Sequence, residues 1–191
     1  MGKKVEEIVT IDLLKKKVNS YTKKDWPIIY KAYSYAAKYH QGQKRESGED
    51  YIVHPLMVAY LLSCMHADYE TICAGLLHDL IEDTDVSYDD IKTNFNEEIA
   101  YLVDGVTKFS HLNFNNKDEF LAMNIRRIIV SMRDDARIVI IKLVDRLHNM
   151  RTIEYKREER RKEIALQTLE IYVPLAYYIG AYDIKCELEN I

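Results

Sequence analysis

The sequence predicts an all-α protein, and three observations support that fold class. Apolar residues recur with helical periodicity, no run of convincing length alternates like a strand, and only six glycines and three prolines interrupt the 191 residues. A chain of this length can bury a substantial core within one domain. We therefore expect residues 1–191 to form a single helical bundle.

The helices are expected to follow one another with few long connections. Amphipathic segments cover about 8–18 and 26–40, and Pro27 lies in the first turn of the second. A charged loop rich in turn formers comes next, and Pro55 then opens an apolar helix over 55–65. Further helices are expected at about 67–82, 87–95, 96–108, 118–132, 136–153 and 158–179, with a mobile loop at 110–117.

Composition excludes several classes of protein. A net charge of −4 creates no overall basic field for nucleic acid or an anionic membrane. Cys64, Cys73 and Cys186 are widely spaced without a CxxC pair, which argues against disulfides or thiolate zinc and fits a reducing compartment. The charged N-terminus is no signal peptide, and no apolar run is long enough to span a membrane. We expect a soluble cytoplasmic protein.

The stretch HDLIEDT, residues 78–84, carries the most chemical information. On a continuous helix His78 and Glu82 lie four residues apart, as do Asp79 and Asp83, so each pair shares an edge. The stretch follows the apolar run ETICAGLL, which predicts a buried helix face. Three buried carboxylates and an imidazole need a compensating partner, and a divalent metal is the simplest one.

A second polar cluster lies in IVIIKLVDRLHNMRT, residues 138–152. Helical spacing places Lys142, Asp145, Asn149 and Thr152 on nearly one line of an otherwise apolar helix. A core helix would fill that line with leucine, so the pattern favours a metal ligand followed by phosphate and sugar binders. His148 points off the line, which favours a structural role for it.

These motifs together resemble a known family. His54, the His78–Asp79 pair and Asp145 follow the H…HD…D order of HD-domain metal phosphohydrolases. The strings RESGEDYIVHPLMVA, GLLHDLIEDT, LVDGVTK, KLVDRLHNMRT and QTLEIYVPLA resemble the hydrolase domain of the RelA/SpoT homologue family over about 32–189. That family degrades the alarmones ppGpp and pppGpp in the stringent response. The resemblance implies an HD-domain bundle around a central metal.

The resemblance also implies a role for particular residues. It makes the metal divalent and usually manganese, with the ligands His54, His78, Asp79 and Asp145. Glu82 and Asp83 match the pair that positions and activates the attacking water. The residues that match the nucleotide-binding pocket are Arg45, Ser47, Lys142, Asn149 and Thr152. The implied reaction removes the 3′-pyrophosphate of guanosine tetra- or pentaphosphate, leaving GDP or GTP and pyrophosphate.

One departure and two alternatives bear on this hypothesis. Glu46 stands where the family commonly has lysine, which reverses a charge at the substrate mouth. The alternatives are an HD phosphohydrolase of another nucleotide and a regulatory module that binds alarmone without cleaving it; the intact HD and ED motifs argue against the second. Long family members continue into a synthetase domain, so this chain is either a small alarmone hydrolase or an excised hydrolase domain of a longer parent chain.

Overall fold

Helices account for the regular structure of the chain. The computed structural model describes residues 9–110 and 135–191, and within these ranges the only β pairing is an isolated bridge between Lys44 and Asp50. The predicted all-α fold class is confirmed. The expected loop residues 111–117 and the expected helix at 118–132 lie outside the described residues, and Ser110 belongs to a helix rather than to that loop.

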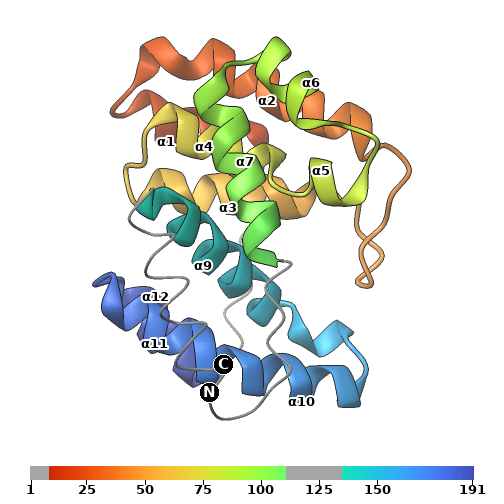
Figure 1. Cartoon of the computed structure of the whole chain (residues 1–191), viewed down its shortest axis with the longest axis vertical. Helices are drawn as coiled ribbons and strands as arrows, with labels where there is room; N and C mark the ends of the chain where they lie inside the picture. The colour runs from red at the N-terminus through yellow and green to blue at the C-terminus, as the bar shows by residue number, and fades with distance from the viewer. Residues whose placement is uncertain (1–8, 111–134) are drawn as a thin grey trace.

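Three helices form the interior and carry the candidate site. They are α3 (Val53–Cys64), α4 (Tyr69–Leu77) and α9 (Ala136–Arg151). The first two are apolar almost all round, as expected for helices that bury every face, and α9 packs against both (Figure 1). α3, α9 and the turn directly after α4 each contribute a side chain to one place in the core.

The N-terminal half covers α3 and α4 from several sides (Figure 1). Thr10 caps the helix that starts at Ile11, and a capping box of Ser87 and Asp90 starts the helix at Tyr88. The elements are α1 (Ile11–Asn19), the 3₁₀ turn η1 (Lys23–Asp25), α2 (Trp26–Tyr39), α6 (Tyr88–Asn94) and α7 (Glu97–Ser110). Among the described helices none has the length and apolar character needed to cross a bilayer.

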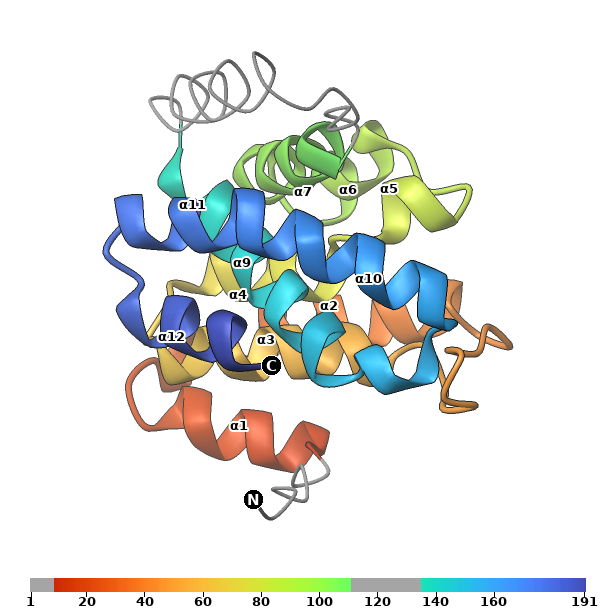
Figure 2. The same cartoon turned by 90° about the horizontal axis from the view of Figure 1, so that it is seen from below.

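The C-terminal part lies across α9. A 3₁₀ turn, η2 (Ile153–Tyr155), leads into α10 (Glu158–Gln167), and the helical path continues through a π-helical turn, η3 (Thr168–Tyr172), into α11 (Val173–Tyr178). Figure 2 shows α10 and α11 along one line, with α12 (Tyr182–Asn190) folded back beside them.

The predicted helix at 158–179 is therefore continuous in path but not uniform. Pro174 cannot donate a backbone hydrogen bond, and its ring crowds the carbonyl of Glu170 in a regular helix. The π-helical turn immediately before it widens the backbone there.

The expected unbroken helix at 67–82 is wrong. The chain leaves α4 after Leu77 and resumes as a short helix, α5 (Leu80–Asp83), with His78 and Asp79 in a turn between them. At this break His78 Nδ1 lies 2.9 Å from the carbonyl oxygen of Gly75. In a continuous helix that oxygen would accept from the N–H of Asp79.

Gly75 has a second role in the same place. A Cβ atom on this residue would lie 2.5 Å from Leu62 Cδ1 of α3, so a larger residue here would force the Leu62 side chain to move. The close approach brings the end of α4, with His78, beside the start of α3, with His54.

Candidate metal centre and active site

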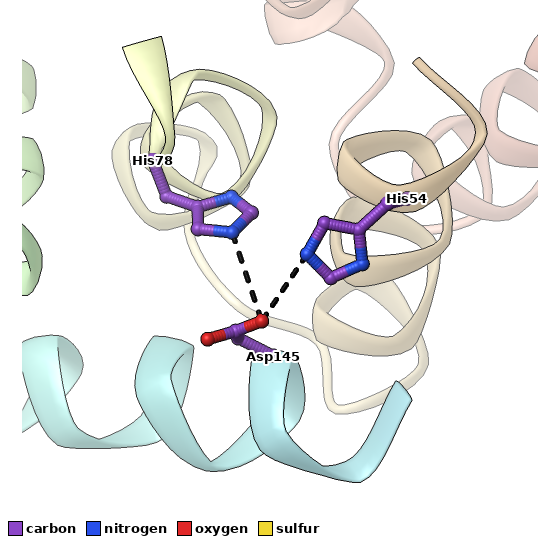
Figure 3. Close-up of side chains that lie close together, drawn as sticks. All are labelled: His54, His78 and Asp145. Carbon is purple, nitrogen blue, oxygen red and sulfur yellow. Dashed lines mark ion pairs between the residues drawn. The ribbon is translucent and has the colours of Figure 1, made fainter. Parts of the chain in front are cut away.

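Three buried side chains from three helical segments converge in the core. Figure 3 shows His54 from the first turn of α3, His78 from the turn after α4, and Asp145 from α9, all pointing toward one another. One ligand atom from each lies within 4.8 Å of the others. Asp145 Oδ1 is 3.1 Å from His54 Nε2 and 3.8 Å from His78 Nε2.

Asp79, the fourth predicted ligand, borders the same point. Its Oδ1 is 3.0 Å from His78 Nε2, and its Oδ2 is 3.6 Å from His54 Nε2. The structure thus brings together all four predicted ligands, with Asp79 at the side that opens to the cavity.

The outward nitrogens of both histidines fix how the rings are protonated. The Gly75 carbonyl can only accept, so His78 Nδ1 carries a hydrogen. His54 Nδ1 is 2.6 Å from His148 Nδ1, to which the Arg45 guanidinium also points at 3.5 Å. Because a guanidinium can only donate, His148 Nδ1 accepts and His54 Nδ1 donates. When it is neutral, each ring therefore presents a lone pair at Nε2 toward the carboxylates.

Lone pairs facing carboxylates repel one another unless a cation lies between them, so this donor set fits a divalent metal. His78 Nε2 is buried and has no hydrogen-bond partner in the described part of the chain, although Asp79 is near. Burial opposes protonation of His78, but Asp79 and Asp145 outweigh it and raise its pKa to about 9. The carboxylates thus attract positive charge, which either a proton or a metal ion supplies.

Burial dominates the pKa of the two other histidines in this cluster. It lowers the pKa of His54, and it lowers that of His148 to about 2, with help from the neighbouring charges of His54 and Arg45. The pKa of Asp145 lies well below its usual range despite burial, because Lys142 and the two imidazoles favour its ionised form.

The candidate centre lies at the floor of an open cavity of about 390 Å³. Lys142, Asn149 and Thr152 line it from the predicted stripe of α9, so the stripe is confirmed as one surface. Lys142 Nζ is 2.8 Å from Asp145 Oδ2, and Asn149 Nδ2 donates to Asp145 Oδ1 at 2.6 Å. These bonds fix the Asp145 carboxylate on both sides.

Arg45 and Ser47 reach the cavity from the turn between α2 and α3. The Arg45 guanidinium donates to Asn149 Oδ1 at 3.3 Å and to Thr152 Oγ1 at 3.1 Å, so it spans the cavity to α9. Ser47 is at the wall and donates to Glu49 at 3.0 Å. All the predicted nucleotide-binding residues therefore line one cavity.

Glu82 and Asp83 also line the cavity, but they are not buried as the sequence led us to expect. The break at His78 turns α5 away from the core, so both carboxylates are solvated at the cavity wall. Only His78 among the polar residues of 78–83 is fully buried, and Asp79 is half-buried.

Tyr51 is a site residue that the sequence reasoning missed. Its hydroxyl lies 2.8 Å from Asp79 Oδ2 and 2.7 Å from Asp83 Oδ2, and it lines the cavity. Burial and these two carboxylates raise its pKa, so it stays a neutral donor. The His40 ring stacks on it with centroids 4.5 Å apart. Its place three residues before His54 is the only sequence signal that could have indicated it.

His148 also contacts a candidate ligand. The predicted structural role is compatible with its contacts, because its ring stacks on His54 with centroids 4.9 Å apart and accepts a hydrogen bond from it. It supports a candidate ligand from behind, as a second-layer partner of a metal site does.

Comparisons with known proteins agree with this geometry. Residues 32–181 match the HD domain. The chain is 48% identical over 163 residues to the bifunctional (p)ppGpp synthase/hydrolase SpoT of Escherichia coli, which covers 85% of this chain and 23% of that protein. It is 47% identical over 162 residues to a guanosine-3′,5′-bis(diphosphate) 3′-pyrophosphohydrolase of Aquifex aeolicus, with the same coverage of 85% and 23%.

A solved structure gives the same result for the fold. It is described as a metazoan orthologue of SpoT that hydrolyses ppGpp, and it matches with a TM-score of 0.67 and 25% identity over 85% of this chain and 92% of that chain. The resemblance to the hydrolase part of the RelA/SpoT family is confirmed. The chain spans under a quarter of the length of the two curated relatives.

Proposed function

Because this chain belongs to the HD-domain family, we propose that it is a metal-dependent hydrolase that removes the 3′-pyrophosphate of ppGpp and pppGpp. The single observation that carries the proposal is the convergence of His54, His78 and Asp145, with Asp79 beside both histidines, at the floor of a cavity lined by cationic and amide side chains. The names of the relatives support the choice of substrate.

The four converging residues would hold the metal, and manganese is the ion that we propose. Imidazole and carboxylate ligands suit manganese, and no thiolate is among them. When bound, the ion supplies Lewis-acid polarisation of a phosphate oxygen and lowers the pKa of water.

The net charge of the cavity lining indicates that a cation must be present before a polyanion can bind. Among its described lining residues the cavity has four basic side chains and five carboxylates. Without an ion it therefore repels a polyphosphate, whereas a divalent cation reverses the sign of its net charge.

The carboxylates at the wall would handle the proton. In the proposed reaction water attacks the phosphorus bonded to O3′, the P–O3′ bond breaks, and GDP or GTP leaves with its 3′-hydroxyl restored. Glu82 or Asp83 accepts the proton of the attacking water, which requires hydrogen-bond reach. The Tyr51 hydroxyl lies within hydrogen-bond distance of both Asp83 Oδ2 and Asp79 Oδ2 and donates to one of them at a time, so it links the position of Asp83 to that of the ligands.

Arg45 and the α9 stripe would bind the rest of the nucleotide. The Arg45 guanidinium is planar and is held by Asn149 and Thr152, so one face is available to pack on the base, as the family resemblance implies. Lys142 keeps its ammonium beside Asp145, where it neutralises charge next to the scissile phosphate.

The decisive experiment separates this function from its alternatives. Protein stripped with EDTA and reloaded with manganese is given ppGpp, pppGpp, GTP, ATP and dGTP, and products are resolved by ion-exchange chromatography. We expect pyrophosphate and GDP from ppGpp only after manganese is restored. Faster release from the other nucleotides would favour a general HD phosphohydrolase, and tight ppGpp binding without turnover would favour a regulatory module.

A further inference from the structure

Two hollows of opposite charge meet at the mouth of the active site. The active-site cavity has more carboxylates than basic side chains among its described lining residues. A neighbouring hollow of about 600 Å³, which we name the outer hollow, is lined by Glu46, Tyr155, Lys156, Arg157 and Arg160. It therefore has three basic side chains against one carboxylate. Glu46, Tyr155 and Lys156 line both hollows, so the two hollows adjoin at these three residues.

An ion pair stands where the two hollows join. Glu46 Oε1 lies 2.8 Å from Lys156 Nζ, and the two side chains are 55% and 36% exposed. The pair links two segments that are 110 positions apart in sequence. Because both groups remain in water, a competing anion can displace the glutamate at little cost.

Glu46 and Lys156 each belong to a segment with a defined backbone conformation. Glu46 belongs to a tight turn in which the Gly48 N–H donates to the Arg45 carbonyl and the Arg45 N–H donates to the Glu49 carbonyl, both at 2.9 Å. Gly48 has a φ of +88°, which favours glycine at this position. On the other side Lys156 follows η2, and Arg157 is the N-cap residue of α10.

We propose that the outer hollow binds the 5′-phosphates of the substrate and that Glu46 sets how strongly it does so. The inference rests on the proposed function, because a guanosine with phosphates at both 3′ and 5′ positions must place its second anionic chain somewhere when the first is at the metal. That second chain leaves the floor through the mouth, where the basic hollow begins. Its phosphates compete with Glu46 for Lys156, and a longer chain competes better.

Glu46 is thus a specificity-determining residue rather than part of the reaction. A lysine at this position would add to the basic hollow, whereas the glutamate of this chain neutralises one of its cations. The expected consequence is weak discrimination between ppGpp and pppGpp in this chain, which becomes stronger when the carboxylate is removed.

The test is a series of ligands that differ only in the number of 5′-phosphates. We call the increase in affinity along this series the ladder. Binding of guanosine 3′-diphosphates with one, two or three 5′-phosphates is measured by calorimetry in the Glu82→Gln background with manganese, which limits turnover. Since an exposed ion pair contributes up to about 1 kcal/mol, we expect Glu46→Gln to tighten the three-phosphate ligand by roughly threefold to fivefold and the one-phosphate ligand by less than about twofold.

A matched variant controls for net charge. Glu97 pairs with Lys92 at the same distance of 2.8 Å, at the opposite end of α7 from the Ser110 that lines the cavity, about 20 Å away at helical rise. Figure 1 shows this end of α7 beside α6, far from α10. Glu97→Gln removes one negative charge and is expected to leave the ladder unchanged. Lys156→Ala and Arg157→Ala are expected to flatten it.

The outcomes separate this inference from the proposed function. Affinities that stay independent of the number of 5′-phosphates in Glu46→Gln, or equal effects of Glu46→Gln and Glu97→Gln, would overturn the role of the outer hollow even if ppGpp is hydrolysed. Conversely, a protein that shows the ladder but releases no pyrophosphate would retain the anion site and lose the proposed activity. Raising the salt concentration is expected to compress the ladder, because solvated charges are screened.

Discussion

The floor and the rim of the active site are built in different ways. The floor consists of His54, His78 and Asp145, fixed by three packed helices and buried at 6% exposure or less. The rim consists of the turn around Glu46 and the segment around Lys156, where the ion-paired side chains are solvated. Each floor charge therefore depends on its neighbours for both stability and chemistry, whereas a rim charge can change almost independently. A substitution at Glu46 should therefore leave the floor intact, whereas a substitution in the floor should disturb its neighbours.

The largest effect should come from removing a floor ligand. His78→Ala is expected to lower turnover of ppGpp by about a thousandfold or more, because the ion it helps to hold is worth several kcal/mol in the transition state. Metal content by mass spectrometry should fall with it, while far-UV circular dichroism keeps its helical signal. A variant that stays active with full metal content would remove His78 from the ligand set.

The second test asks whether floor charges stabilise one another. In metal-free protein, Asp145→Ala is expected to reduce the free energy of unfolding in urea by about 3 kcal/mol, because the buried Lys142 ammonium loses its carboxylate. The double variant Asp145→Ala/Lys142→Met should recover most of that loss without recovering metal. Glu187→Ala breaks the more exposed pair with Arg151 and should cost less than about 1 kcal/mol. Equal costs would erase the contrast between floor and surface.

A substitution at Tyr51 tests whether its hydroxyl, which lies between the floor and the rim, contributes to turnover. Tyr51→Phe keeps the ring against His40 but loses the hydroxyl shared by Asp79 and Asp83, so kcat is expected to fall roughly tenfold to hundredfold with little change in KM. Tyr21→Phe removes a comparable half-buried hydroxyl bonded to the Ala67 carbonyl and should leave kcat unchanged. A change confined to KM would assign Tyr51 to substrate binding instead.

Low pH should destabilise the protein through His148, the residue that lies behind His54. The pKa of His148 is lowered from 6.5 to about 2, so the unfolded chain binds a proton that the folded protein excludes. Its contribution is present above pH 6.5 and is lost as the pH falls, by about 1.4 kcal/mol per pH unit for one proton. Urea unfolding of metal-free protein between pH 6.5 and 4 should show a shallower slope for His148→Asn; parallel slopes would contradict this role.

The smallest effect belongs to the rim. Lys156→Met removes the partner of Glu46 at a solvated position, and we expect the free energy of unfolding to change by less than about 0.5 kcal/mol. A loss comparable to that of Asp145→Ala would mean that the rim is as constrained as the floor. Urea titrations of the two variants under the same buffer make that comparison directly.

Local sequence patterns were sufficient to predict much of the site. The Lys142–Thr152 stripe needs only the period of a helix, and its members do meet at Asp145. The order of His54, His78–Asp79 and Asp145 indicated that distant segments converge, through resemblance to a family rather than through any local rule. The burial expected for Glu82 and Asp83 was wrong, because α4 ends at Leu77 and the short helix α5 takes a new direction after the turn at His78 and Asp79.

The sequence by itself therefore determined the fold class and the stripe on α9, since these depend on helical periodicity, while the ligand set came from the resemblance to a family and stays a prediction. Only the tertiary structure decided what touches them. Tyr51 lies between two carboxylates, His148 lies behind His54, and Glu46 is paired across the mouth with Lys156. These contacts join residues 28 to 110 positions apart, and no local pattern encodes them because they depend on how helices pack.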